Sequence, residues 1–178
     1  MTAIEAIEHA SRIILVGVAL LAMVGLVRHR DRATLDIVLV LSCLAVPVVI
    51  GVLPQSLRSP FWVATLSAMI VLSRPYLILR LLQHFRAVSP WIVRGVLGAT
   101  VTSWLLLVLY ESPRPVSFTL GLVLFISAVE TFAAISFWRG ALATAGVSRW
   151  RFSFAGLASG LLAGTILLVG LGDRKSVV

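Results

Sequence analysis

The strongest constraint on this sequence is a series of apolar runs, each close to the length that a helix needs to cross a bilayer. A spanning helix requires about 20 predominantly apolar residues, and its backbone groups are hydrogen-bonded within the segment itself. Short polar gaps separate six such runs, at residues 10–28, 33–53, 61–82, 90–110, 116–138 and 152–171. The pattern predicts an all-α fold, a polytopic transmembrane helical bundle with six spans, in which residues 1–172 form one membrane domain.

The charge of the chain supports a membrane location and argues against nucleic acid as a partner. Only 12% of the residues are charged, whereas a soluble domain carries about 25%. The formal net charge is +8, which in a soluble protein would suggest a nucleic-acid ligand. Here the arginines lie in the gaps between apolar runs, where basic residues set the orientation of the spans. The partner that we expect is the lipid bilayer.

The arginines are divided unequally between the two ends of the predicted spans. The gaps after the first, third and fifth spans hold nine of them: Arg28, Arg30, Arg32, Arg80, Arg86, Arg94, Arg139, Arg149 and Arg151. The opposite side holds three: Arg12, Arg58 and Arg114. Because basic loops stay in the cytoplasm, we expect the N-terminus outside and the protein in the inner (plasma) membrane.

Two charged residues fall inside the spans and are the candidate site. Arg74 lies about 9 Å deeper than Arg80 at 1.5 Å per residue, and an arginine near the bilayer centre costs roughly 2.5–3.5 kcal/mol. Pro75 cannot donate to the carbonyl of Val71, which predicts a kink. One interpretation is a helix end whose arginine reaches the interface. The other is an intramembrane pair between Arg74 and Glu130, in a span of the same direction, with Arg74 and Pro75 as a charged pivot.

The sixth run carries small residues at the spacing used for close helix packing. Gly156, Gly160 and Gly164 recur every four residues and would form one ridge of a helix. Such ridges pack both within bundles and between copies of a chain. Packing within the bundle and formation of a homodimer therefore both stay open.

No residue pattern in the chain indicates catalysis. The three histidines lie in terminal or loop regions, the chain has one cysteine, and no facing histidine pair or metal triad is expected. H-E-x-x-H, G-x-S-x-G and glycine-rich phosphate-loop motifs are missing from the sequence. We predict no catalytic residue, metal or cofactor in this chain, and whether its parent protein is an enzyme is left open.

The last residues, 173–178, read DRKSVV and place two basic side chains on the side that is otherwise poor in arginine. A short native basic tail is one interpretation. The other is that these six residues translate a sequencing-adapter read in frame, and this is the one that we expect. The chain would then be a fragment that stops before a seventh span.

Two segments carry a resemblance to a known family: SRPYLILRLLQHFRAVSPW at 73–91 and GVSRWRFSFAGLASGLLAGTILLVGL at 146–171. They resemble the seven-helix N-terminal membrane regions of bacterial sensor histidine kinases, and similar regions precede cyclases and phosphatases. The resemblance spans residues 10–171. It implies a sensory or anchoring module for two-component signal transduction, commonly dimeric, with a seventh helix and a cytoplasmic effector to follow. This sequence departs from the family in having neither a seventh helix nor a phosphoacceptor or nucleotide-binding segment.

Two other functions remain as alternatives. A small multi-pass transporter would be expected to repeat its broken helices in both halves, but the prolines within spans, Pro47 and Pro75, both lie in the first half. A structural membrane protein of six helices would fit if residues 173–178 are native.

Overall fold

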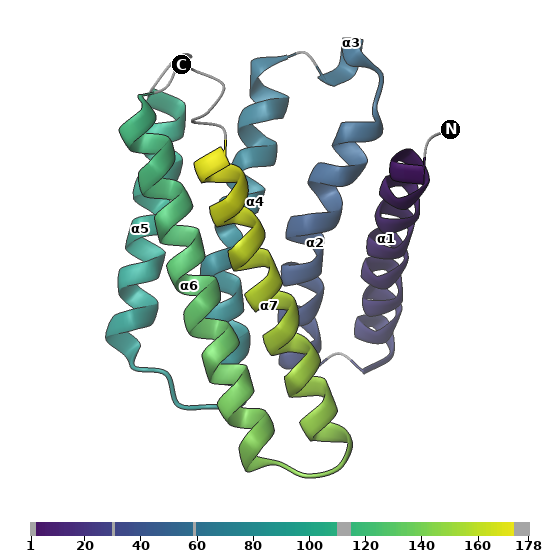
Figure 1. Ribbon diagram of the computed structural model, residues 1–178, viewed down its shortest axis with the longest axis vertical. Helices are drawn as coiled ribbons and strands as arrows, with labels where there is room; N and C mark the ends of the chain where they lie inside the picture. Colours follow the sequence, from purple (N-terminus) through teal and green to yellow (C-terminus); the bar gives the residue numbers. More distant parts are fainter. Residues whose placement is uncertain (1–2, 30, 59, 110–114, 173–178) are drawn as a thin grey trace. The chain divides into compact units, whose positions relative to one another are not determined.

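A computed structural model describes residues 3–29, 31–58, 60–109 and 115–172, and every regular element in these ranges is a helix (Figure 1). In chain order the helices are α1 (Ala3–His29), α2 (Arg32–Val52), α3 (Gln55–Arg58), α4 (Phe61–Gln83), α5 (Pro90–Leu109), α6 (Val116–Ala143) and α7 (Val147–Gly172). Residues 173–178, interpreted above as an adapter-derived tail, lie outside the described residues. The all-α fold class is confirmed for the described residues.

Five helices in the described part of the chain are long and apolar enough to cross a membrane: α2, α4, α5, α6 and α7 as far as Leu168. By length and composition the chain is therefore a multi-pass membrane protein. The first predicted span, residues 10–28, lies within α1 but is not one of these five helices. A sixth span and the outside location of the N-terminus both stay predictions.

Helices α6 and α7 are longer than the apolar runs that predicted them. The run 116–138 ends before Arg139, yet α6 continues to Ala143. The run 152–171 begins after Arg149 and Arg151, yet α7 begins at Val147. Helical hydrogen bonds do not depend on apolar side chains, so a helix can extend past the hydrocarbon core into the headgroup region. The connection turns through Gly146, whose φ of 67° lies in the left-handed region that favours glycine.

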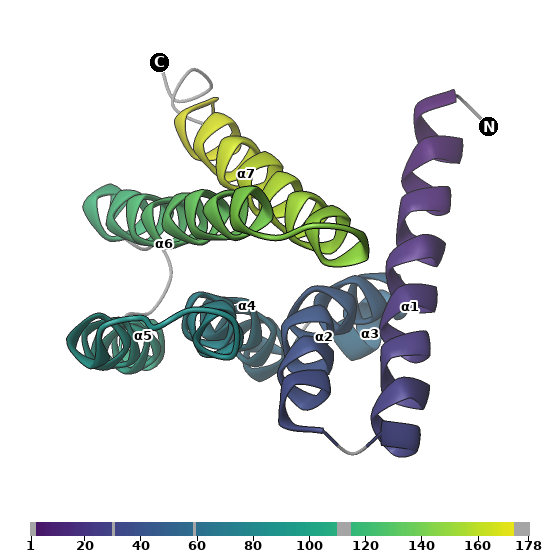
Figure 2. The same ribbon diagram turned by 90° about the horizontal axis from the view of Figure 1, so that it is seen from below.

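The chain divides into two compact units, Met1–Leu77 and Ile78–Val178, here called unit 1 and unit 2. The division falls inside α4, two residues after Pro75. In unit 1, α1 and α2 pack side by side (Figures 1 and 2). Helix α2 ends before Pro54, because the residue that precedes a proline is driven out of the helical region. Leu53 accordingly has a ψ of 150°.

Unit 2 is organised around the helix pair α6 and α7, which lie side by side in Figures 1 and 2. The last turns of α4 pack on α6 through a cluster of buried apolar side chains: Ile78, Leu79, Leu82, Val129, Ala133 and Phe137. Around this cluster lie partly buried residues of α5 and α7, among them Val96 and Phe152.

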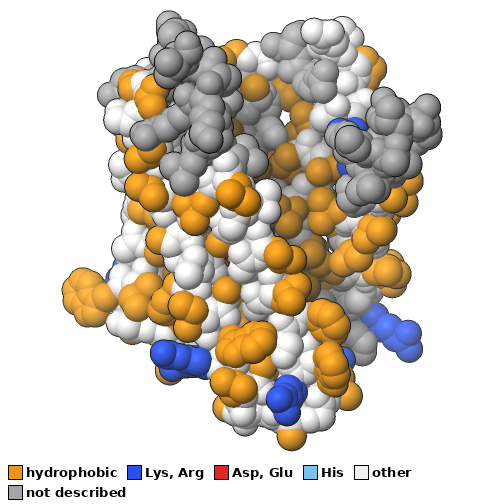
Figure 3. All heavy atoms as spheres, viewed as in Figure 1, with side chains coloured by type: hydrophobic (Ala, Val, Ile, Leu, Met, Phe, Trp, Pro, Cys, Tyr) orange, Lys and Arg blue, Asp and Glu red, His pale blue; other side chains and the backbone are white. Residues whose placement is uncertain are grey.

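Large apolar side chains remain exposed along the helices. Figure 3 shows them over α6 and α7, with Lys and Arg side chains at the lower end of this pair. Leu157, Leu161 and Leu168 on α7 are 55%, 66% and 75% exposed. Exposed apolar side chains gathered in this way are rare on an aqueous protein, whereas lipid tails solvate them well. The exposed surface is what a bilayer-embedded bundle requires.

Candidate functional site

Arg74 and Pro75 are both buried within the continuous helix α4. Arg74 is 7% exposed and Pro75 less than 2%. The Ser73 hydroxyl donates to the Met69 carbonyl oxygen at 2.8 Å, and a serine bonded back in this way weakens and bends a helix. Pro75 in turn has no N–H for the carbonyl of Val71. Two perturbations of the helical hydrogen-bond ladder thus fall in one turn, close to the division between the units.

Unit 1 also buries the only cysteine of the sequence, Cys43 on α2. A second buried charged residue of unit 1 is Asp36, also on α2, which is 0% exposed. Arg74, at 7% exposure, lies inside protein and not at a lipid-facing surface, as intramembrane charges usually do.

Glu130 is fully buried in α6, at 0% exposure. Its sequence neighbours on α6, Val129 and Ala133, belong to the apolar cluster of unit 2. Because Arg74 belongs to unit 1 and Glu130 to unit 2, the pairing of the two stays a prediction.

The three glycines of α7 that recur every four residues differ in what lies beside them. A Cβ atom on Gly156 would meet the Ala134 carbonyl oxygen of α6 at 3.2 Å, whereas one on Gly160 would meet the Ala134 Cβ at 3.8 Å. A Cβ on Gly164 would meet nothing within 4 Å. Close approach of α7 to α6 thus depends on Gly156. Whether this ridge of glycines also joins two copies of the chain stays a prediction.

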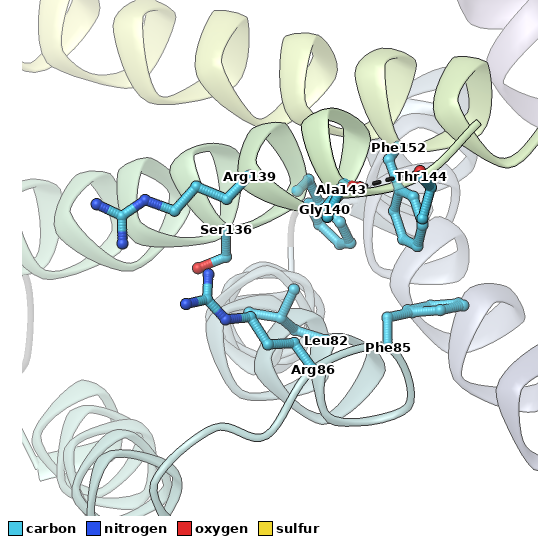
Figure 4. Close-up of a pocket in the computed structure, with 10 residues that line it drawn as sticks. Leu82, Phe85, Arg86, Ser136, Arg139, Gly140, Ala143, Thr144 and Phe152 are labelled. Atoms are coloured by element: carbon cyan, nitrogen blue, oxygen red, sulfur yellow. Dashed lines mark hydrogen bonds between the residues drawn. The ribbon is translucent and has the colours of Figure 1, made fainter.

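A cavity of about 390 Å³ lies in unit 2, where the end of α4 meets α6 and α7 (Figure 4). Two arginines line it: Arg86, just past the end of α4, and Arg139 on α6. The backbone N–H of Arg86 donates to the Leu82 carbonyl at 2.9 Å, which ties this residue to the last turn of α4. In Figure 4 the Arg86 side chain extends toward Ser136, a lining residue that is itself only 6% exposed.

Aromatic rings and a helix cap form the rest of the cavity wall. Phe152 of α7 makes an edge-to-face contact with Phe85, with ring centroids 5.2 Å apart, and stacks on Phe137 at 6.4 Å. Thr144, where α6 ends, donates its hydroxyl hydrogen to the Gly140 carbonyl at 2.9 Å (Figure 4). The cavity thus has an apolar aromatic side and a side that carries positive charge.

The sequence did not predict this cavity. Arg86 and Arg139 lie more than fifty residues apart in the sequence and served there only as signals of orientation. The hydropathy pattern contains no signal that both line one cavity, which depends on how α4 and α6 pack. For metals, the described part of the chain holds no group of three His, Cys, Asp or Glu side chains that could bind an ion.

Taken together, the described helices and their exposed apolar surface define a helical membrane protein. No protein-family model matches the sequence, and no curated protein or solved structure is significantly similar to it.

Proposed function

We propose that this chain is an integral-membrane sensory or anchoring module of a signal-transduction protein, of the kind that the sensor histidine kinases carry. In this proposal it lies in the plasma membrane with its N-terminus outside, and the nine arginines in the gaps after the first, third and fifth runs face the cytoplasm. The resemblance of residues 10–171 to the membrane regions of these kinases supports the assignment to signalling.

The observation that carries the proposal is the position of the charged, proline-containing turn of α4. Ser73 and Pro75 perturb the hydrogen-bond ladder of this helix on either side of the buried Arg74, next to the point where the chain divides into two compact units. A helix that continues through such a point can transmit a change in tilt from one unit to the other as a hinge does. A change in the bilayer around unit 1 would then alter the angle at which the last turns of α4 enter unit 2.

The test is a chimera in which the full chain is joined, through the seventh helix of a sensor histidine kinase, to the catalytic region of that kinase. Autophosphorylation is measured in nanodiscs of phosphatidylcholine with short or with long acyl chains. We expect the rate to differ between the two bilayers by several-fold for the unmodified chain. Pro75→Ala should reduce this difference, because it restores the hydrogen bond to the Val71 carbonyl.

Pro47 offers a matched control, since it also lies inside a long apolar helix, α2, but away from the division between the units. Pro47→Ala should leave the dependence on bilayer thickness intact. Equal rates in both bilayers for the unmodified chain, with the chimera shown to be folded, would contradict a sensory role. Equal effects of the two proline variants would contradict the pivot at Pro75.

A further inference from the structure

We infer that the cavity between α4, α6 and α7 is a binding site for the phosphate headgroup of an anionic phospholipid. This assignment does not depend on the proposed signalling function. It is carried by the two arginines, the buried hydroxyl and the aromatic wall that line one cavity of about 390 Å³.

The charge of the cavity selects an anion. Arg86 and Arg139 both line it, and none of the described lining residues is acidic. The wider surroundings have the same sign: the described basic residues of unit 2 are Arg80, Arg86, Arg94, Arg139, Arg149 and Arg151, against a single described carboxylate, Glu130. Two guanidinium groups on different elements suit the several oxygens of a phosphate, which accept charge-assisted hydrogen bonds from each.

Stabilisation of helix ends does not by itself account for this arrangement. Basic side chains near the C-terminus of a helix interact favourably with its exposed carbonyls, and Arg86 and Arg139 both lie near such ends. That role requires each arginine only at its own helix. It does not require both to line one cavity with Ser136, whose buried side chain adds a hydroxyl donor on the same side as Arg86 (Figure 4).

The level of the cavity along the helices favours a lipid over a soluble anion. Exposed tryptophans mark the same ends of the helices of unit 2: Trp91 at the start of α5, Trp138 near the end of α6 and Trp150 near the start of α7. Tryptophan is enriched at the level of the headgroups. The phenylalanine wall formed by Phe85, Phe137 and Phe152 supplies an apolar surface for the glycerol and the first acyl carbons. Basic pockets between transmembrane helices bind anionic headgroups in this way.

The test is native mass spectrometry of the purified full chain in detergent, with equal amounts of phosphatidylglycerol and phosphatidylcholine. We expect the unmodified protein to retain one phosphatidylglycerol in preference to phosphatidylcholine by about tenfold, since each basic residue near the headgroup contributes a several-fold preference. The double variant Arg86→Gln with Arg139→Gln should lose this preference.

The matched control removes the same charge from the same end of unit 2 outside the cavity. Arg94 stacks over Trp91 with its guanidinium carbon 5.7 Å from the ring centre, Arg149 is exposed, and neither lines the cavity. The double variant Arg94→Gln with Arg149→Gln should keep the preference for phosphatidylglycerol. If both double variants lose it equally, the attraction comes from the general surface charge and the cavity assignment is overturned.

Two further measurements keep the outcome decisive. Thermal unfolding in phosphatidylcholine micelles should give the same midpoint for the cavity variant and the control variant, which shows that lost binding is not lost folding. If the cavity variant alone unfolds at lower temperature without any change in lipid preference, the arginines only stabilise helix ends and the inference fails. Glycerol phosphate without acyl chains should not displace the bound lipid, and displacement at equal concentration would assign the site to a soluble phosphate.

Discussion

The two helix pairs of this protein, α1 with α2 and α6 with α7, pack in different ways. Between α1 and α2 the structure leaves an open groove of about 530 Å³, lined by Ile13, Val16, Leu20, Val48, Val49, Val52 and other mostly apolar residues. Helix α7 instead approaches α6 so closely that a Cβ atom on Gly156 would lie 3.2 Å from the Ala134 carbonyl oxygen. In a bilayer, lipid tails are as apolar as leucine, so apolar surface alone does not draw helices together.

Small residues distinguish the tightly packed helix pair from the loosely packed one. Small side chains fix the α6–α7 pair through backbone approach: Gly156 on α7 lies against Ala134 of α6, and Ser159 and Ala163 of α7 are buried. The α1–α2 groove contains one small lining residue, Gly17, with nothing within 4 Å of its added Cβ. We expect substitutions that add volume to have large effects between α6 and α7 and small effects between α1 and α2.

The largest effect is expected for Gly156→Leu. Its side chain would collide with the Ala134 carbonyl of α6, and overpacking of this kind costs about 3 kcal/mol. The free energy of unfolding in mixed detergent micelles measures the loss. The control is Gly164→Leu on the same helix, which has open space and should stay within about 0.5 kcal/mol of the unmodified protein. Equal losses for both variants would contradict the packing of α7 on α6 through Gly156.

An intermediate effect is expected if Arg74 and Glu130 pair as the sequence predicts. Removing one charge would leave the other buried, so Arg74→Ala and Glu130→Gln should each destabilise the protein, while the double variant loses less than the sum. A coupling energy of about 1–2 kcal/mol is expected for residues in contact. Strictly additive losses in the same unfolding measurement would show that the two charges belong to separate environments, one in each unit.

The smallest effect is expected for Gly17→Leu in the α1–α2 groove. The new side chain fills open space and raises the helix propensity of α1, so the stability should change by less than about 1 kcal/mol, toward higher values. A loss of more than about 2 kcal/mol would show that α1 and α2 pack as tightly at this position as α6 and α7 do, and the contrast between the two pairs would fail.

The sequence predicts the helices of this protein well and the sites between them poorly. The runs 33–53 and 61–82 match α2 and α4 to within one residue at each end, because the length of an apolar run is fixed by the bilayer. The short helix α3 was not predicted, since four residues carry no detectable period. The sequence left open whether Arg74 reaches the interface or lies inside the protein, and the structure buries both Arg74 and Glu130. The cavity at Arg86 and Arg139 was not predicted, because it arises from tertiary packing of residues distant in sequence.

The direction of the helices is predicted from the unequal distribution of arginines between the two ends of the spans. One labelling experiment tests this direction most directly. In a Cys43→Ser background, single cysteines replace Gln55 of α3, between α2 and α4, and Ala145, between α6 and α7; both residues are exposed. Intact cells are treated with a membrane-impermeant maleimide. We predict labelling of Gln55→Cys in intact cells and of Ala145→Cys only after permeabilisation. The reverse result would place the arginine-bearing ends outside and contradict both the orientation and the proposed cytoplasmic output.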